Sequence, residues 1–226
     1  WLLVIFGILA ITTTFYAFAY VAVYREPHTA VRASKWINQN VPVESVILKE
    51  HWEEGLPDLE NHQVRELPMY EADSLVKARV LASELSKADF LYLFSNRMYG
   101  TLPRMEKRYP MSRGYYESLF AGELGYELVN VESSYPSIFG ITFFEETFQR
   151  ARLPDATKSL DSEKPSSVSL NLGFADESFS VYDHPKVMIF QNSGRFPAEL
   201  LREKIQSYWK TSQILKGPTA SRSVGL

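Results

Sequence analysis

Cysteine is absent from the 226 residues of this chain, which excludes a disulfide framework, a thiolate zinc site and a cysteine nucleophile. The patterns GxGxxG, GxxxxGK(S/T), GxSxG and HExxH, which mark common nucleotide-binding and catalytic sites, are missing as well. The formal net charge of −3 provides no basic field for nucleic acid. We therefore expect no catalytic residue, no metal site, no cofactor and no nucleic-acid partner within these residues.

Charge is also missing from the first part of the chain, because residues 1–24 contain no Asp, Glu, Lys or Arg. A helix of this length spans the ~30 Å hydrocarbon core of a bilayer. Tyr16, Tyr20 and Tyr24 recur at every fourth position, as aromatic residues do at a membrane interface. We predict a transmembrane helix over 1–24, the last span of a longer protein. A cleaved signal peptide, with Ala17–Ala19 as the cleavage site, and a buried core helix are the alternatives.

The charged part of the chain has the length and pattern of one compact domain, predicted over residues 25–209. Extended segments starting near Ser45, Asp89 and Tyr126 alternate with amphipathic helices, and Phe90–Phe94 is a continuous apolar run typical of a central strand. This order requires right-handed crossovers. The predicted fold class is α/β: one N-terminal transmembrane helix followed by a small three-layer domain with a mainly parallel sheet, in which these three strands are adjacent.

Several local features have less regular patterns. Asp73 precedes an amphipathic helix and is predicted to cap its first turn. Residues near 149–176 are rich in Ser, Lys, Asp and Pro and are interpreted as an exposed excursion. The late segments Phe179–Tyr182 and Val187–Phe190 are predicted to form two strands or one kinked strand. Residues 210–226 are predicted to be a disordered tail.

A polar cluster, Glu50–Glu54, follows the first predicted strand. Open parallel sheets bind ligands at the carboxyl ends of their strands, so Glu50 and His51 are candidate contacts to a sugar or a phosphate. A solvated acidic loop is the alternative. A metal site would have to combine both residues with Asp58 and His62, and that spacing fits no standard ligand set.

A second polar cluster, Ser95–Gly100, follows the predicted central strand. Arg97 and the nearby Arg104 offer planar groups for phosphate or carboxylate, and Tyr99 offers a stacking face for a sugar. Ordinary salt bridges within a loop explain these residues equally well. The pair Asp183–His184 suggests an oriented general base, but adjacent strand residues point to opposite faces, so a structural turn is favoured.

Segments in a consistent order over most of residues 20–192 resemble one enzyme family. The matching segments are Tyr24–Thr29, Ala33–Ile37, Asn40–Pro42, Glu50–Glu53, Leu56–Pro57, Ser95–Gly100, Arg108–Pro110, Tyr115–Tyr116, Leu119–Phe120, Gly122–Tyr126 and Phe179–Val187. In these segments the chain looks like the family 39 glycosyltransferases of bacteria and archaea. These belong to the GT-C superfamily of lipid-carrier-dependent enzymes and are related to protein O-mannosyltransferases.

The resemblance implies a multi-span enzyme that transfers a sugar from a polyprenyl-phosphate carrier to an acceptor. In similar enzymes a catalytic aspartate lies in the first extracytoplasmic loop, which would be upstream, so this chain alone is expected to transfer no sugar. Whether the complete enzyme uses a divalent metal stays open. The resemblance implies an extracytoplasmic domain at the cell membrane, against the weak cytoplasmic preference of Arg25, Arg32 and Lys35. The expected partners are membrane lipid, the polyprenyl-phosphate sugar donor and upstream transmembrane helices.

Under this interpretation a parallel sheet brings the two polar clusters to one edge. Two alternatives from other classes stay open. One is a non-catalytic, single-pass membrane-anchored binding or interaction module, and the other is a nucleotide-binding α/β domain, although a glycine-rich first turn is missing. The predicted substrate-binding residues are Glu50, His51, Arg97, Tyr99 and Arg104.

Overall fold

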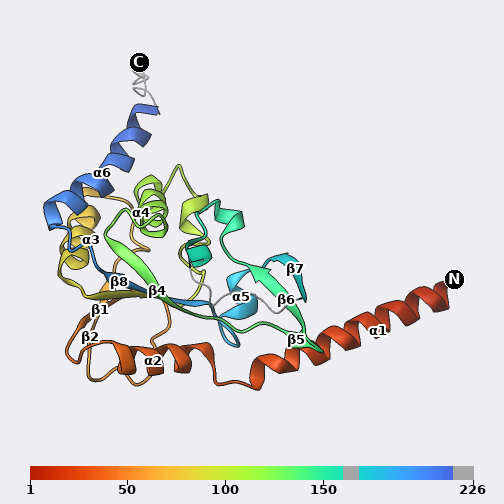
Figure 1. Ribbon diagram of the computed structural model, residues 1–226. Coiled ribbons are helices and arrows are strands. Elements are labelled where there is room, and N and C mark those ends of the chain that lie inside the picture. Colours follow the sequence, from red (N-terminus) through yellow and green to blue (C-terminus); the bar gives the residue numbers. More distant parts are fainter. Residues whose placement is uncertain (160–167, 216–226) are drawn as a thin grey trace, which may run out of the picture.

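A five-stranded sheet forms the centre of the computed structural model, which describes residues 1–159 and 168–215 (Figure 1). Its strands are β1 (Val46–Glu50), β2 (Gln63–Leu67), β3 (Phe90–Leu93), β4 (Tyr126–Glu132) and β8 (Val187–Asn192). The strand order is β2-β1-β3-β8-β4. β1 pairs in parallel with β2 and with β3, whereas β8 is antiparallel to both of its neighbours, β3 and β4.

Helices cover both faces of this sheet (Figure 1). On one face lies α2 (Thr29–Asn40), and on the other lie α3 (Leu75–Lys87), α4 (Pro110–Phe120) and α6 (Ala198–Leu215). Successive strand residues point to opposite faces, so Ile47 joins the core under α2 while Leu48 joins the larger core under α3, α4 and α6. The predicted α/β class with three layers is confirmed, and all of Phe90–Leu93 is buried, as predicted for a central strand.

The prediction of a mainly parallel sheet is wrong, because β8 is inserted between β3 and β4. The strand that starts at Tyr126 belongs to the same sheet and has the direction of β3, but it does not neighbour it. After β4 the chain leaves the sheet, builds a second small sheet and re-enters as β8 at the same end, because Glu132 at the end of β4 pairs with Val187 at the start of β8. Local sequence patterns predict that Val187–Phe190 is extended, but they do not determine whether this strand is parallel or antiparallel to its neighbours.

The second sheet consists of β5 (Ser137–Ile138), β6 (Ile141–Glu146) and β7 (Val168–Phe174), in the order β5-β6-β7. Part of the predicted excursion therefore pairs with β6 as a regular strand. The short helices η3 (Gln149–Ala151) and η4 (Ala156–Ser159) precede it. The segment predicted as a strand at Phe179–Tyr182 is instead the end of α5 (Glu177–Ser180) and the turn after it.

The uncharged N-terminal segment forms α1 (Leu2–Tyr20), which continues as η1 (Val21–Tyr24). Most of α1 projects away from the domain, and of its residues only Ala19 is buried (Figure 1). Its length and apolar composition suffice to cross a membrane, and a membrane anchor and a signal sequence both have these properties. The alternative of a buried core helix does not fit, because Ala19 is the only buried residue of α1.

Two boundaries differ from the sequence-based expectation. α3 is capped by Ser74, whose side chain accepts a hydrogen bond from the Lys77 amide. Asp73 instead accepts hydrogen bonds from the amides of Met111 and Ser112, at the start of α4. At the other end of the chain α6 runs to Leu215, beyond the predicted start of a tail at residue 210, and the rest of that predicted tail, residues 216–226, lies outside the described residues.

Candidate functional site

The two polar clusters predicted from the sequence do meet, because β1 and β3 are parallel neighbours. Ser95, after β3, lies with its hydroxyl oxygen 3.1 and 3.0 Å from the two carboxylate oxygens of Glu53, after β1. Arg97 donates to the backbone carbonyl of Trp52 and forms an ion pair of 2.8 Å with Glu177 of α5. These contacts connect both strand ends to α5.

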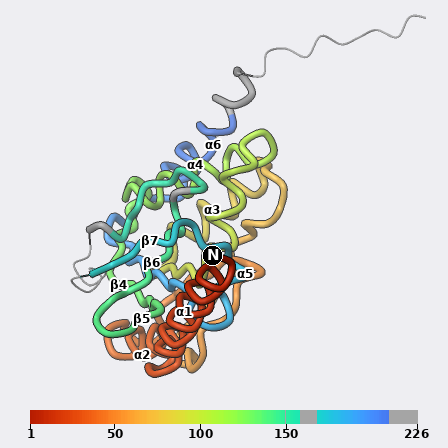
Figure 2. Tube along the Cα trace, turned by 90° about the vertical axis from the view of Figure 1, so that its right-hand side faces the viewer, coloured from red at the N-terminus to blue at the C-terminus, as the bar shows by residue number. Residues whose placement is uncertain are grey.

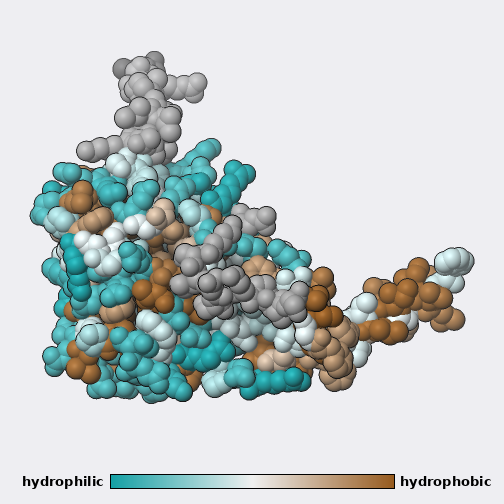
Figure 3. Space-filling view, viewed as in Figure 1, coloured by the Kyte–Doolittle hydropathy of each residue, from teal (hydrophilic) through white to brown (hydrophobic). Residues whose placement is uncertain are grey.

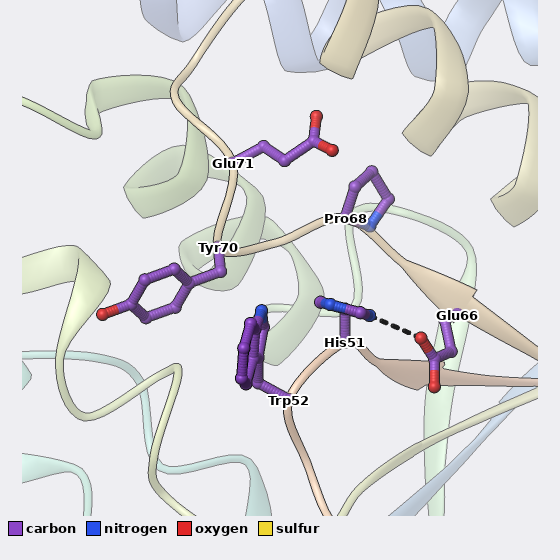
Figure 4. Close-up of a pocket in the computed structure, with 6 residues that line it drawn as sticks. All are labelled: His51, Trp52, Glu66, Pro68, Tyr70 and Glu71. Carbon is purple, nitrogen blue, oxygen red and sulfur yellow. Dashed lines mark hydrogen bonds and ion pairs between the residues drawn. The ribbon is translucent and has the colours of Figure 1, made fainter.

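Beside this junction lies an open cleft of about 300 Å³, a volume at the lower end of small-molecule sites. Figure 4 shows the rings of Trp52 and Tyr70 on one side, and His51 with its bond to Glu66 on the other. The Trp52 and Tyr70 side chains are large and apolar but 66% and 56% exposed. The lining residues, called the aromatic cleft below, are His51, Trp52, Glu66, Pro68, Tyr70 and Glu71.

The backbone of Trp52 has an unusual conformation, with φ at 73°. This region is costly for a residue with a β-carbon, and such strain persists where surrounding contacts impose it. The contacts here are the hydrogen bond from Arg97 to the Trp52 carbonyl and the burial of the adjacent Glu53 against Ser95. Arg97 therefore acts on the cleft by fixing the loop that presents the Trp52 ring.

The segment that carries Tyr70 is fixed by Lys77, which is 1% exposed. Its ammonium group donates to the carbonyls of Met69 and Glu71 at 2.7 and 2.8 Å, and to the Ser112 hydroxyl at 2.8 Å. These two carbonyls flank Tyr70 in the chain. Both aromatic side chains thus stand on loops that buried polar groups hold in place, which lowers the entropic cost of binding a ligand.

The charged side chains of the aromatic cleft are mainly acidic. Glu66 binds His51 and lies 3.0 Å from the Lys49 ammonium, and its hydrogen bond with His51 lowers the pKa of the Glu66 carboxyl. Glu71 is exposed and adds a second carboxylate to the lining. Carboxylates accept hydrogen bonds from hydroxyl groups but repel phosphate. The cleft therefore suits a neutral polyol with an apolar face better than a phosphate group.

Glu50, predicted as a ligand contact, is buried with no exposed surface. The Tyr116 hydroxyl donates to one carboxylate oxygen at 2.6 Å, and the other oxygen has no hydrogen-bond partner among the residues that the structure describes. Burial, reinforced by the nearby Glu53 carboxylate, raises the pKa of Glu50 to about 8. Burial also raises the pKa of Glu53 to about 7. These two acids are buried and are not part of the cleft lining.

The other predicted contacts have different surroundings. His51 lines the aromatic cleft. Tyr99 is fully buried, with its ring 5.3 and 5.4 Å from those of Phe120 and Phe148, so it presents no face to a ligand. Arg104 is exposed on η2 (Leu102–Arg104), and no ion pair holds it within the described part of the chain.

Two residues of the cleft, Trp52 and Tyr70, are not among the five predicted substrate-binding residues. Trp52 belongs to the Glu50–Glu54 cluster. A tryptophan in a polar loop at the end of a strand is the feature of the sequence that points to a binding role. Tyr70 comes from the linker between β2 and α3, whose return to the end of β1 depends on the pairing of β1 with β2. That pairing could not be predicted from the weak pattern of β2.

Two further interpretations of the sequence concern a metal site and a general base formed by Asp183 and His184. Among residues 1–159 and 168–215, no group of three or more His, Asp or Glu side chains is arranged to hold a metal ion. Asp183 accepts hydrogen bonds from Tyr20 and Tyr24, whereas the buried His184 lies 3.0 Å from Glu145. The two neighbours thus have separate structural partners, in agreement with the favoured turn.

Comparisons with protein-family models, with curated proteins and with solved structures find no match to this chain. The resemblance to family 39 glycosyltransferases therefore stays a prediction from the sequence segments.

Proposed function

We propose that this chain is the membrane-anchored, extracytoplasmic domain of a larger glycosyltransferase that uses a polyprenyl-phosphate sugar as donor. In this proposal α1 is a transmembrane helix beside upstream helices of the same protein, and the aromatic cleft binds the sugar part of the acceptor or of the carrier. The observation that carries the proposal is the pair of exposed, rigidly held rings, Trp52 and Tyr70, beside two carboxylates.

The chemistry of a sugar matches this lining. One face of a pyranose ring consists of C–H groups, which pack against aromatic faces, and its hydroxyl groups donate to carboxylates. The excess of carboxylates over cations repels the phosphate of a lipid carrier. The cleft therefore contacts the sugar, while the phosphate and the catalytic aspartate belong to the membrane part of the complete enzyme.

Saturation-transfer NMR with a panel of methyl hexosides, using the full chain in detergent micelles, tests the cleft. Trp52→Gly removes the ring but suits the positive φ of 73°, so the protein should stay folded while binding weakens about tenfold, or ~1.4 kcal/mol. Arg97→Ala should weaken binding as well, because it frees the Trp52 loop. Arg104→Ala, which removes an equally charged side chain that is not part of the cleft lining, is the matched control and should bind like the wild type. Equal binding by all four proteins would contradict the assignment.

Sugar transfer tests the enzyme part of the proposal separately. The complete membrane protein should transfer a hexose from a polyprenyl-phosphate donor, and the same protein with Trp52→Gly should show a higher KM for the sugar acceptor or donor. This chain alone should transfer none. Transfer by the isolated chain, or no transfer by the complete protein with any hexose donor, would contradict it.

The aromatic cleft also favours a second candidate, a non-catalytic glycan-binding module on a single membrane anchor. It shares the cleft and the anchor with the first proposal and requires no transferase activity. Sugar binding without transfer by the complete protein would favour this alternative.

A further inference from the structure

The second sheet packs against α1 within the uncharged segment. Phe143 of β6 lies with its ring centroid 5.3 Å from Tyr16 and 6.3 Å from Phe15. At 1.5 Å per residue, Phe15 lies about 14 Å along the helix before Tyr24, and no charged residue occurs between them. The second sheet therefore contacts α1 at a position along the helix that still belongs to its uncharged, apolar segment.

The face of this sheet that contacts α1 continues outward as exposed apolar side chains. Leu170 is the register partner of Phe143, and Val168 is that of Ile141, so these residues share one face. Val168 and Leu170 are 51% and 50% exposed. Leu172, at the next alternate position of β7, is 51% exposed. The segments 137–144 and 168–174 contain no charged residue.

The turn between β5 and β6 contains an aromatic residue, Phe139, in a backbone conformation with positive φ that aromatic residues rarely adopt. Phe139 and Gly140 have φ angles of 49° and 77°, a conformation for which Asn, Asp and Gly are preferred. Phe139 is nevertheless 90% exposed. A strained position with an exposed aromatic ring is typical of a functional contact.

These features face the direction in which α1 leaves the domain. Figure 2, in which the N-terminus points toward the viewer, shows β5, β6, β7 and α5 around the emerging helix. In Figure 3 the hydrophobic surface of α1 continues onto the adjoining part of the domain. We propose that Phe139, Val168, Leu170 and Leu172, called the sheet face below, insert into the interfacial region of the lipid bilayer beside α1.

The backbone limits the depth of this insertion. Among the strands that the structure describes, β7 lies at an edge of the second sheet, and open sheet edges are not tolerated in the hydrocarbon core. The sheet face therefore lies at the level of the headgroups and the first acyl carbons, where aromatic and aliphatic side chains bind. A second contact with the bilayer beside α1 fixes the orientation of the domain, and of its aromatic cleft, relative to the membrane.

Single labels test this inference, which rests on the proposed membrane anchoring of α1. Because the chain has no cysteine, Leu170→Cys, Ser169→Cys and Ile8→Cys each carry one environment-sensitive fluorophore in the full chain reconstituted into phosphatidylcholine vesicles. Ser169 is the neighbour on the other face of β7, since it pairs with Thr142, and Ile8 reports on α1. We expect a blue-shifted emission that brominated lipids quench at Leu170 and Ile8, and quenching by aqueous iodide at Ser169.

The pattern of labels separates the possible failures. Lipid quenching at Ile8 with iodide quenching at Leu170 would overturn the inference and leave the anchor intact. Iodide quenching at both positions would overturn the anchor as well. Protection of Leu170 from both quenchers would show that protein, such as another helix or a second copy of the chain, covers the sheet face, and this too would overturn the inference.

Discussion

Glu50 is a buried carboxyl group whose protonation is linked to the stability of the fold. Its pKa is raised from 4.5 to about 8 by burial, so the folded state binds the proton more tightly than the unfolded state. The contribution of Glu50 to the free energy of unfolding is then fully present at low pH and is lost as the pH rises from about 4.5 to about 8. Glu53, with a pKa raised to about 7, contributes in the same direction.

Glu50→Gln should therefore flatten this pH dependence, because an amide does not ionise and still accepts the hydrogen bond from Tyr116. Denaturant unfolding of the full chain in detergent between about pH 5 and pH 8.5 measures the effect. The wild type should lose more stability over this interval than Glu50→Gln. Glu66→Gln is the control, because the pKa of Glu66 is lowered and not raised. A wild-type stability that is constant over the interval would contradict the prediction.

The neighbouring residues Asp73 and Ser74 show how one loop supports two helices. Ser74 caps α3 through the Lys77 amide at 3.0 Å. Asp73 receives the Met111 amide at 2.7 Å and the Lys77 ammonium at 3.3 Å, so it caps α4 and balances a buried cation. Ser74→Ala should cost about 1 kcal/mol. Asp73→Ala should cost about 3–5 kcal/mol, because it leaves the buried charge of Lys77 without its counter-charge.

Urea unfolding of both variants distinguishes these roles. A cost for Asp73→Ala similar to that for Ser74→Ala would mean that Lys77 needs no counter-charge, since its carbonyl and hydroxyl partners would then suffice. Asp73→Asn, which keeps the acceptor oxygens but not the charge, should lie between the two.

The elements differ in how much of them the sequence predicts. Phe90–Phe94 is apolar throughout, so its burial in a central strand follows from composition alone. The carboxyl ends of β1 and β3 lie side by side because the two strands are parallel neighbours. A parallel sheet therefore predicts the contact between the loops that carry Glu53 and Ser95. The direction of β8 and the return of Tyr70 to the cleft depend on pairings between distant segments, and no local pattern contains them. The sequence predicts the wrong helix for Asp73 for the same reason, because α4, whose amides Asp73 binds, starts far along the chain.

The whole molecule depends on how α1 joins the domain. Tyr20 contributes its hydroxyl 3.2 Å from Asp183, and its ring covers His184, with 5.6 Å between the ring centroids. Ala19 and Val23 are buried in the same junction. The last part of the uncharged segment is thus a part of the domain core, whereas the first part makes few contacts with it. Removal of residues 1–24 is therefore expected to affect the domain and not only its attachment to the membrane.

Two truncations of different length separate these parts. Removal of residues 1–12 should leave the free energy of unfolding in detergent unchanged. Removal of residues 1–24 exposes the buried pair of His184 and Glu145 and the Phe143 ring, so it should cost about 2 kcal/mol or more. Hydrogen exchange should then accelerate in β6 and in residues 181–186, while β1 and β3, which lie far from the junction, stay protected. Equal stability and equal exchange in the two truncated proteins would show that α1 is attached to the domain without supporting it, and that its orientation is set by the membrane alone.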